Sequence, residues 1–389
     1  MRILFSSTEG LGHIQPMLPL ALKLRERGHH VLWATADPGR TRIAAEGIET
    51  VAAGISQADR QTEYERRWPE SAALTGEALA AHFFPRSFGI LDAPAMFGDL
   101  LPIARSWQPD IIVTDAAEFA APVVARALRL PLVTHGFGLV VPPQRVQATV
   151  DETEHLWAAI GEVAPPFGGF YELLYIDIYP RSLQPEDLTR VGRIQSMRPT
   201  SITRITGEVP SARVQAAIAD GRPLIYLTFG TLFNVNDAFR SAVEALGLLS
   251  DVVVLVTVGP TGDVDAFGPQ PGHVTVERYI AQSELLGHVA VVVSHGGSGT
   301  MLGALAEGIP LVVLPQAADQ LRNASAAARA GAGIALFEGE TSVDTVRTAI
   351  LTALTDVGVR AAAQRLQSEI AAMPTVDDAA MAIERLRLG

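Results

Sequence analysis

The chain has 389 residues, 48% hydrophobic and 19% charged, and this length and composition favour two folded domains over a disordered chain. Its formal net charge of −12 argues against a nucleic-acid or anionic-membrane partner, because such partners need a basic surface. Cysteine is absent, which excludes disulfides, a thiol nucleophile and cysteine metal ligands, and suits a reducing cytoplasm.

The sequence predicts neither a signal peptide nor a membrane span. The opening residues, MRILFSSTEG, hold too few consecutive apolar residues for the core of a signal peptide. The most apolar stretch, residues 120–143, is interrupted by Arg126, Arg129 and His135, and it fits a helix, a strand and a loop better than a membrane span. We therefore expect a cytoplasmic protein that does not insert into a membrane.

In the N-terminal half, strand and helix patterns alternate. Residues 2–7 form a buried strand, apolar residues then recur at helical spacing, and residues 29–35 form a second strand. The same order of strand, helix and strand returns over residues 109–136. This βαβ order predicts a parallel sheet. Residues 56–107 show no strong strand pattern, and irregular helices and loops are expected there, lining a pocket or forming an edge of the core.

A second alternating series begins with the strand predicted at residues 222–231. The polar residues 195–215 hold two prolines and lack periodicity, and they mark the join between the two series. We predict an α/β fold of two doubly wound domains that face each other across a cleft. The N-terminal domain is expected over residues 1–205 and the C-terminal domain over 216–370, with an amphipathic helix within 371–389 that packs back on the N-terminal domain.

In the segment VVVSHGGSGT (291–300), a buried strand is followed directly by a glycine-rich turn, and a helix is then predicted from Ser298 to Glu307. Such a turn offers unpaired amides and the positive end of a helix dipole to an anion, and His295 and Thr300 add further donors. A phosphate site is favoured over an ordinary tight turn. The segment is neither a Walker loop, since no lysine follows the glycines, nor a GxGxxG fingerprint.

Two other groups of polar residues follow strands of the same predicted sheet. Thr228, Gly230 and Thr231 stand where the strand at 222–231 ends, and ligands collect at such strand ends in open α/β sheets. Asp319 and Gln320 follow a later strand and suit the recognition of hydroxyl groups. A turn or a helix N-cap is the alternative interpretation of each group.

In the N-terminal domain, His13 is placed in the loop after the first strand and is a candidate general base, because histidine titrates nearest neutrality. Asp115 closes another strand of that sheet, so its carboxylate could orient the imidazole of His13. Glu118 is a rival acid in the same segment. The sequence cannot supply the distances that would decide between them.

Two stretches carry a family resemblance: GHIQPMLPLALKLRERGHHV (12–31) and VERYIAQSELLGHVAVVVSHGGSGTMLGALAEGIPLVVLPQAADQLRNA (276–324). The chain resembles the GT-B glycosyltransferases, specifically the inverting, nucleotide-sugar-dependent group that decorates bacterial natural products such as macrolides and enediynes. The resemblance runs nearly end to end and is strongest in the C-terminal half. It implies a GT-B fold of two Rossmann-like domains facing a cleft.

The resemblance also implies roles for the residues of the donor site. Asp319 and Gln320 would bind sugar hydroxyls, while Tyr279 would stack on the base and the backbone of Ile280 would contact it. Gly303 stands where plant-type UDP-sugar users carry a ribose-binding glutamate, which favours a dTDP-linked deoxysugar over a UDP-linked sugar. The donor diphosphate would be held by Thr231, His295, Gly297, Ser298, Gly299 and Thr300.

For the acceptor, the resemblance implies that His13 is the catalytic base and Asp115 its partner. An apolar natural-product aglycone is expected as the acceptor because aromatic residues gather in the variable segments. These residues are Phe83, Phe84, Phe88, Phe137, Phe167 and Phe170.

The predicted reaction is an inverting transfer of a sugar to an acceptor hydroxyl, with no metal and no cofactor beyond the nucleotide-sugar. The DxD triplet at Asp263 and Asp265 is interpreted as a surface loop. The partners would be a small-molecule donor and acceptor, with a homodimer as one possible assembly. Alternatives are a sugar-nucleotide epimerase, a lipid-linked transferase, a non-catalytic nucleotide-sugar binder or activator subunit, and an NAD-dependent dehydrogenase, which would lack its fingerprint here.

Overall fold

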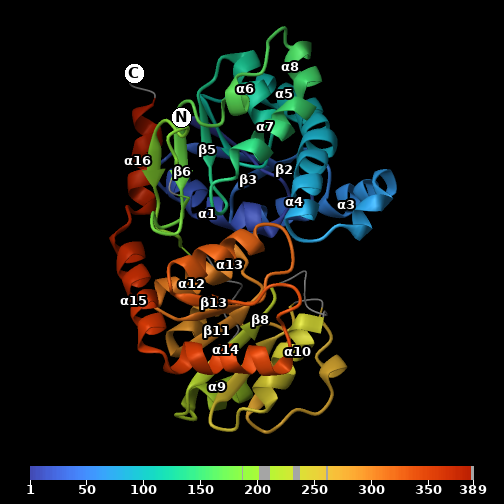
Figure 1. Ribbon diagram of the computed structural model, residues 1–389. Coiled ribbons are helices and arrows are strands. Elements are labelled where there is room, and N and C mark those ends of the chain that lie inside the picture. Colours follow the sequence, from blue (N-terminus) through green and yellow to red (C-terminus); the bar gives the residue numbers. More distant parts are fainter. Residues whose placement is uncertain (186, 201–210, 231–236, 260–261, 387–389) are drawn as a thin grey trace. The chain divides into compact units, whose positions relative to one another are not determined.

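The computed structural model describes residues 1–389 apart from 186, 201–210, 231–236, 260–261 and 387–389. The chain divides into two compact units (Figure 1). Unit 1 comprises Met1–Tyr179, Pro185–Thr200 and Met373–Gly389, and unit 2 comprises Pro180–Gln184 and Ser201–Ala372. In the described part of the chain, no helix combines the length and the apolar character needed to cross a membrane.

Unit 1 is built on a parallel sheet, as the βαβ spacing predicts. Its strand order within the described residues is β3-β2-β1-β4-β5-β6-β7. The order reverses between β1 and β4, which pair directly. The carboxyl ends of these two strands therefore form the topological switch point where open α/β sheets bind ligands. The strands are β1 Arg2–Ser6, β2 His30–Thr35, β3 Glu49–Ala52, β4 Ile111–Asp115, β5 Leu132–His135, β6 Leu174–Asp177 and β7 Ile194–Ser196.

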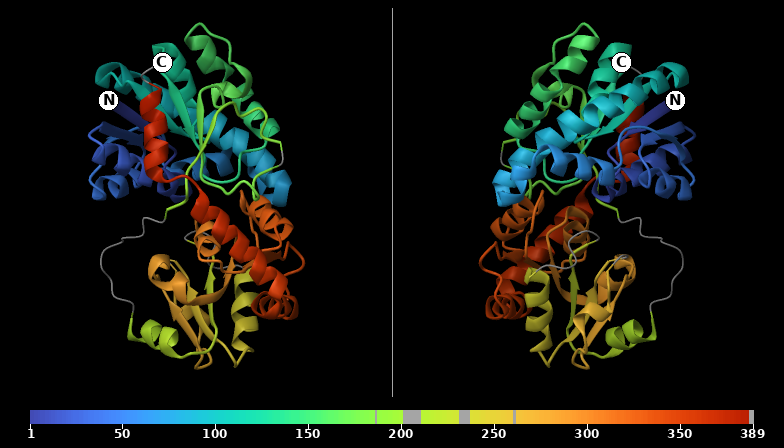
Figure 2. Two further views of the ribbon diagram at one scale, coloured as in Figure 1. Left: turned by 90° about the vertical axis from the view of Figure 1, so that its left-hand side faces the viewer. Right: turned by 90° about the vertical axis from the view of Figure 1, so that its right-hand side faces the viewer.

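Helices cover both faces of this sheet (Figures 1 and 2). On one face, the buried side chains of Leu4, Leu32 and Ile112 form a hydrophobic cluster with residues of α5 and α6. The helices of unit 1 are α1 Leu11–Glu26, α2 Gly39–Ala45, α3 Gln57–Arg67, η1 Pro69–Ala73, α4 Gly76–Phe84, η2 Pro85–Asp92, α5 Ala93–Trp107, α6 Ala120–Leu128, α7 Pro143–Glu152, α8 Glu154–Ala159, η3 Pro166–Gly169 and α16 Val376–Arg385.

Irregular helices and loops were expected over residues 56–107, and the irregular helices are present, but α4, η2 and α5 follow one another without the loops expected between them. Pro85 is the first residue of η2 and Pro94 is the second residue of α5. The middle element η2 is a π-helix. Wide turns of this kind are rare and often occur at functional sites.

Unit 2 carries a second parallel sheet, whose described strands follow the order β10-β9-β8-β11-β12-β13. Its order reverses between β8 and β11. The strands are β8 Leu224–Thr228, β9 Val253–Thr257, β10 Val274–Glu277, β11 Val289–Ser294, β12 Leu311–Val313 and β13 Gly333–Ala335. The helices are α9 Ala212–Ala219, α10 Asp237–Gly247, η4 Asp265–Phe267, α11 Gln282–Leu285, η5 Leu286–His288, α12 Ser298–Ala306, α13 Gln320–Arg329, α14 Val343–Thr355 and α15 Val357–Ala372.

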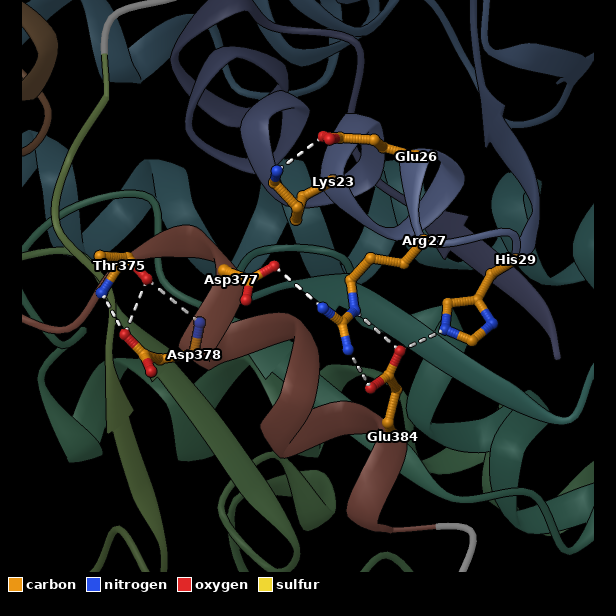
Figure 3. Close-up of polar contacts among 8 residues, drawn as sticks. All are labelled: Lys23, Glu26, Arg27, His29, Thr375, Asp377, Asp378 and Glu384. Atoms are coloured by element: carbon orange, nitrogen blue, oxygen red, sulfur yellow. Dashed lines mark hydrogen bonds and ion pairs between the residues drawn. The ribbon is translucent and has the colours of Figure 1, made fainter.

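The C-terminal helix α16 belongs to unit 1 and packs on α1. Arg27, just after α1, donates to Asp377 at 3.0 Å and through two nitrogens to Glu384, while His29 Nε2 lies 2.8 Å from Glu384 (Figure 3). At the start of α16, Thr375 and Asp378 form a reciprocal capping box. Charge pairing thus links α16 to the end of α1, and the cap stabilises the first turn of α16.

Candidate active site

His13 lies in the first turn of α1, not in the preceding loop, so its expected position was wrong by a few residues. The helix begins at Leu11 because the amides of His13 and Ile14 both donate to the carbonyl oxygen of Gly10, at 2.9 and 3.1 Å. The imidazole keeps 17% of its surface exposed. It thus stands at the carboxyl end of β1, on the switch point of the sheet.

Asp115 is the last residue of β4, and its carboxylate is fully buried. Its Oδ2 lies 2.9 Å from Nδ1 of His13, within ion-pair distance, although the approach angle is not that of a hydrogen bond. The amide of Ala117 donates to Oδ1 at 2.9 Å and the hydroxyl of Thr8 donates to Oδ2 at 3.3 Å. The carboxylate is therefore fixed by its own strand end and faces the imidazole.

Glu118, the rival acid, is also buried, but its oxygens are engaged elsewhere. Ser6 donates to Oε2 at 2.5 Å, and the amides of Ala120 and Ala121 donate to the carboxylate at the start of α6. Burial raises the pKa of Glu118 to about 7 against these hydrogen bonds. Of the two acids, Asp115 is the one that contacts His13.

The sequence analysis did not single out His135 as a site residue, yet it pairs in register with Asp115 on the neighbouring strand β5. Its Nδ1 lies 2.8 Å from the carbonyl oxygen of Gly136, and its buried Nε2 has no hydrogen-bond partner among the described residues. Burial lowers the pKa of His135 to about 4, so the ring is neutral at neutral pH.

The aromatic residues predicted to form an acceptor pocket divide into two kinds. Phe84, Phe88 and Phe170 are buried members of one hydrophobic cluster, and Phe83, Phe137 and Phe167 are partly buried against it. Two of them flank the base: the ring centroid of Phe137 lies 4.5 Å from that of His13, and the centroid of Phe88 lies 5.8 Å away. The wall beside His13 is therefore aromatic.

In unit 2, the glycine turn joins β11 to α12 at the second switch point. Gly296 has a φ of +87°, which favours glycine, and a Cβ there would lie 2.6 Å from Val313. A Cβ on Gly297 would lie 2.7 Å from Nε2 of His295, whereas a Cβ on Gly299 would meet nothing within 4 Å. The first two glycines are required by the turn and its packing, and only Gly299 borders open space.

His295 is buried beneath this turn, with 8% of its surface exposed. Burial lowers its pKa to about 4, against the opposing effects of the Asp319 charge and a hydrogen bond with the Thr228 backbone. A neutral imidazole has a single N–H, and in this structure the Thr228 carbonyl already accepts it. His295 therefore differs from a positively charged phosphate ligand.

Asp319, at the N-cap of α13, faces Ser298 in the first turn of α12. The Ser298 hydroxyl and Nδ2 of Asn323 each lie 2.9 Å from its Oδ2 and donate to it. Asn323 is fully buried and also donates to the carbonyl oxygen of Gly296 at 2.9 Å. The sequence analysis missed Asn323, whose only signal is its position four residues after Asp319, on the same helix face.

The remaining donor-site residues lie around this core. Gln320 is buried, and its Oε1 accepts the amides of Gln316 and Ala317 at 2.8 and 3.1 Å, so this oxygen closes the loop before α13. Gln282, which the sequence analysis also missed, donates through Nε2 to the Thr300 hydroxyl at 3.1 Å.

The predicted base-binding residues Tyr279 and Ile280 follow β10, and Tyr279 is exposed while Ile280 is buried. A side chain at Gly303 would approach Leu286 at 3.2 Å and Gln282 at 3.9 Å. Thr231 lies outside the described residues. Within the described residues, no group of three or more His, Asp or Glu side chains could hold a metal ion.

Comparisons with known proteins identify the family. The chain matches the family described as erythromycin biosynthesis protein CIII-like, in its N-terminal domain over residues 22–198 and in its C-terminal domain over residues 243–386. It is 30% identical over 433 residues to 4'-demethylrebeccamycin synthase of Lentzea aerocolonigenes, which covers 99% of each chain. The chain belongs to this family of bacterial natural-product glycosyltransferases.

The glycosyltransferase has further relatives over its full length. It is 30% identical over 412 residues to the elloramycin glycosyltransferase of Streptomyces olivaceus, covering 98% of this chain and 96% of that one. A solved structure of a Streptomyces sp. SF2575 glycosyltransferase, complexed with thymidine diphosphate, is 27% identical and has a TM-score of 0.77, with 99% of each chain covered. The predicted family, the GT-B fold and the enzyme class are confirmed.

Proposed function

We propose that this glycosyltransferase moves a sugar from a dTDP-linked donor to a hydroxyl of an apolar natural-product aglycone, with inversion at the anomeric carbon. The observation that carries the proposal is the approach of His13 to the buried Asp115, at 2.9 Å. A protein that only bound nucleotide-sugars would need no such pair. The cysteine-free sequence suits an enzyme of the cytoplasm.

His13 is the proposed general base. Its Nδ1 faces Asp115, which leaves Nε2 to accept the proton of the acceptor hydroxyl. The acceptor oxygen then forms a bond to the anomeric carbon, while the bond from that carbon to the diphosphate oxygen breaks and its electron pair leaves with the nucleotide. The negative charge of Asp115 favours the imidazolium that forms, as in other base–carboxylate pairs.

The glycine turn of unit 2 is the proposed diphosphate site. The amides at the start of α12 point their positive dipole end toward a bound anion, and Gly299 leaves open space beside them. His295 would donate its single N–H to the diphosphate in place of the Thr228 carbonyl, and Thr231 is proposed to help. Charge on the leaving diphosphate would then be stabilised by fixed dipoles without a metal.

The other proposed donor contacts come from the polar residues beside the turn. Asp319 and Gln320 would bind sugar hydroxyls, with one oxygen of Asp319 already engaged by Ser298. Tyr279 and Ile280 would contact the base. Gly303 supports dTDP over UDP, since it brings no carboxylate to a ribose 2′-hydroxyl. Two kinds of relative support the proposal: an elloramycin glycosyltransferase, and two solved glycosyltransferase structures complexed with thymidine diphosphate.

The acceptor is proposed to lie against the aromatic wall beside His13. Phe88 and Phe137 flank the imidazole, so an apolar ring system could pack there while presenting a hydroxyl to Nε2. The buried Phe84 and Phe170 would then support this wall from the core. Phe83 lies partly exposed at the same cluster.

The decisive experiment incubates the enzyme with dTDP-glucose or UDP-glucose and a panel of phenolic and macrolactone aglycones, with and without EDTA. We expect a glycoside of inverted anomeric configuration, a higher kcat/KM with the dTDP donor, and no effect of EDTA. In the same assay, His13→Ala should lower kcat by about 10²–10⁴-fold, while replacement of the exposed His155 should not change kcat. Retained configuration or a fully active His13→Ala enzyme would overturn the proposal.

A further inference from the structure

A buried ion pair lies beside the base site and plays no part in the mechanism above. Arg60 of α3 donates through Nη1 to Oδ2 of Asp92, the last residue of the π-helix η2. Arg60 is 5% exposed and Asp92 is 6% exposed. The second carboxylate oxygen, Oδ1, is buried without a hydrogen-bond partner among the described residues. Buried carboxylates normally have both oxygens satisfied, so a purely structural ion pair would be incomplete here.

The pair is linked to His13 through an aromatic ring. The guanidinium carbon of Arg60 lies 5.0 Å from the centroid of Phe88, and the Phe88 ring lies 5.8 Å from the imidazole. Phe88 and Asp92 both come from η2 and are four residues apart. Asp92 also lines a small cavity together with Thr8 and Glu118, and Thr8 donates to the carboxylate of Asp115.

The charges of these groups act on one another. Burial raises the pKa of Asp92 to about 6; Arg60 and His13 oppose that rise, and Asp115 adds to it. Because such an interaction is reciprocal, a negative charge on Asp92 favours the protonated form of His13. The charge of Asp92 therefore acts in the same direction as that of Asp115, and the positive charge of its partner Arg60 acts in the opposite direction.

The other titratable groups around the base do not duplicate this effect. Glu118 has its pKa raised to about 7 by burial, and His135 has its pKa lowered to about 4, so the charge of each is reduced or absent near neutrality. Glu9 accepts the amide of Gln57 at 2.9 Å, at the start of α3.

We propose that Asp92, held by Arg60, is a positioning residue for the base: it favours the imidazolium of His13 that forms when the acceptor loses its proton. The inference rests on the proposed function of His13. It assigns a role to the π-helix, which brings the flanking ring of Phe88 and the carboxylate of Asp92 to the same side of the base site.

The test reads the protonation of His13 directly, in the full chain and without turnover. The histidines are labelled with ¹³C at Cε1, and the His13 resonance is identified by its loss in His13→Gln. We expect Asp92→Asn to move the titration midpoint of this resonance to lower pH by about 0.5–1 unit. Asp92→Glu keeps the carboxylate and should return the midpoint most of the way to the wild-type value. An unchanged midpoint in Asp92→Asn would overturn the proposal.

A second variant separates this effect from the loss of an arginine's carboxylate partner in general. Glu77→Gln removes a carboxylate, itself 67% exposed, from the buried Arg145, and it should leave the His13 midpoint in place; an equal shift would count against the proposal. If Asp92→Asn does not fold, Arg60→Gln with Asp92→Asn replaces the ion pair by neutral amides. Its midpoint should also fall, by less, and a wild-type midpoint would overturn the inference.

The two claims can fail separately. Full activity of His13→Ala would refute the base itself. An inactive His13→Ala combined with an unshifted midpoint in Asp92→Asn would refute only the role of Asp92.

Discussion

Each unit places a histidine where the strand order of its sheet reverses, and the two histidines have different surroundings. His13 keeps part of its surface exposed and lies 2.9 Å from the carboxylate of Asp115. His295 is buried under a glycine turn, with its pKa lowered to about 4. A histidine beside a fixed carboxylate is suited to take up a proton, whereas a buried neutral one is suited to donate an N–H without becoming charged.

The comparison extends to the groups around each histidine. Unit 1 places buried acids near His13, whereas unit 2 places glycines, hydroxyls and the partly exposed Asp319 near His295. The same fold element, a strand end at a switch point, therefore supports two chemistries because the residues after the strand differ. The following predictions test this difference between the two histidine sites.

The largest effect is expected from the carboxylate that contacts the base. Asp115→Asn should lower kcat by about 10²–10⁴-fold, because an amide neither stabilises the imidazolium nor fixes the ring in the same way. Glu118→Gln should keep most of the activity, since Glu118 contacts Ser6 and the helix amides instead. Steady-state kinetics of both variants test the assignment, and equal losses would remove the distinction between the two acids.

In unit 2, two glycine substitutions separate a phosphate site from a plain turn. Gly299→Ala meets open space and should raise helix stability slightly, yet weaken dTDP binding by about tenfold if a phosphate lies against this backbone. Gly297→Ala would place a Cβ 2.7 Å from Nε2 of His295 and should lower the melting temperature. Calorimetric titration and thermal melts measure both. Unchanged dTDP affinity in Gly299→Ala would indicate that the segment is an ordinary turn and not a phosphate site.

A moderate, pH-dependent effect is expected from Glu118. Its folded pKa of about 7 lies above the ordinary value of 4.5, so the folded state binds the proton more tightly. The stability that this contributes is present below pH 4.5 and is lost as the pH rises through 7. The free energy of unfolding of Glu118→Gln, relative to that of the wild type, should therefore increase as the pH rises from 4.5 to 7, by on the order of 2 kcal/mol. Urea melts at pH 5 and pH 8 measure this difference. A variant that is more stable relative to the wild type at pH 5 than at pH 8 would contradict the prediction.

The smallest effect is expected at the C-terminal helix. Glu384 has its pKa lowered to about 2, first by its hydrogen bond from Arg27 and then by that from His29. Its contribution is thus present above pH 4.5 and is lost as the pH falls toward 2. Glu384→Gln should lower the melting temperature by roughly 1–3 °C at neutral pH and by less at high salt. Glu26→Gln, which breaks only an exposed pair with Lys23 on α1 (Figure 3), is the control and should have no effect.

Local sequence patterns were enough to predict the two parallel sheets and the residues at their switch points. The alternation of strands and helices predicts parallel sheets, and in such sheets the residues after the strands meet at one edge. His13 and Asp115, 102 positions apart in the sequence, are brought together by this rule alone. The glycine turn was also recognisable, because a buried strand runs directly into Gly296, Gly297 and Gly299; its role as a phosphate site stays a prediction.

The residues that the sequence analysis missed lack such a pattern. Arg60 and Asp92 pair across two helices of a segment without any strand, and neither residue type is unusual in a helix. Gln282 reaches Thr300 from a short helix in another part of the chain. The prolines and glycines of residues 56–107 suggested loops between irregular helices, whereas α4, η2 and α5 follow one another without a loop, with Pro102 inside α5. Pairing of side chains at long sequence separation depends on helix packing, which local periodicity does not encode.

The division between the two histidines is tested most directly by measuring dTDP affinity and turnover in the same two variants, His13→Gln and His295→Gln. The account predicts that His13→Gln binds dTDP with wild-type affinity while its turnover falls by about 10²-fold or more. It predicts that His295→Gln binds dTDP more weakly than the wild type. If His13→Gln loses dTDP affinity as well, or if His295→Gln binds dTDP unchanged, the assignment of proton transfer to one unit and nucleotide binding to the other is wrong.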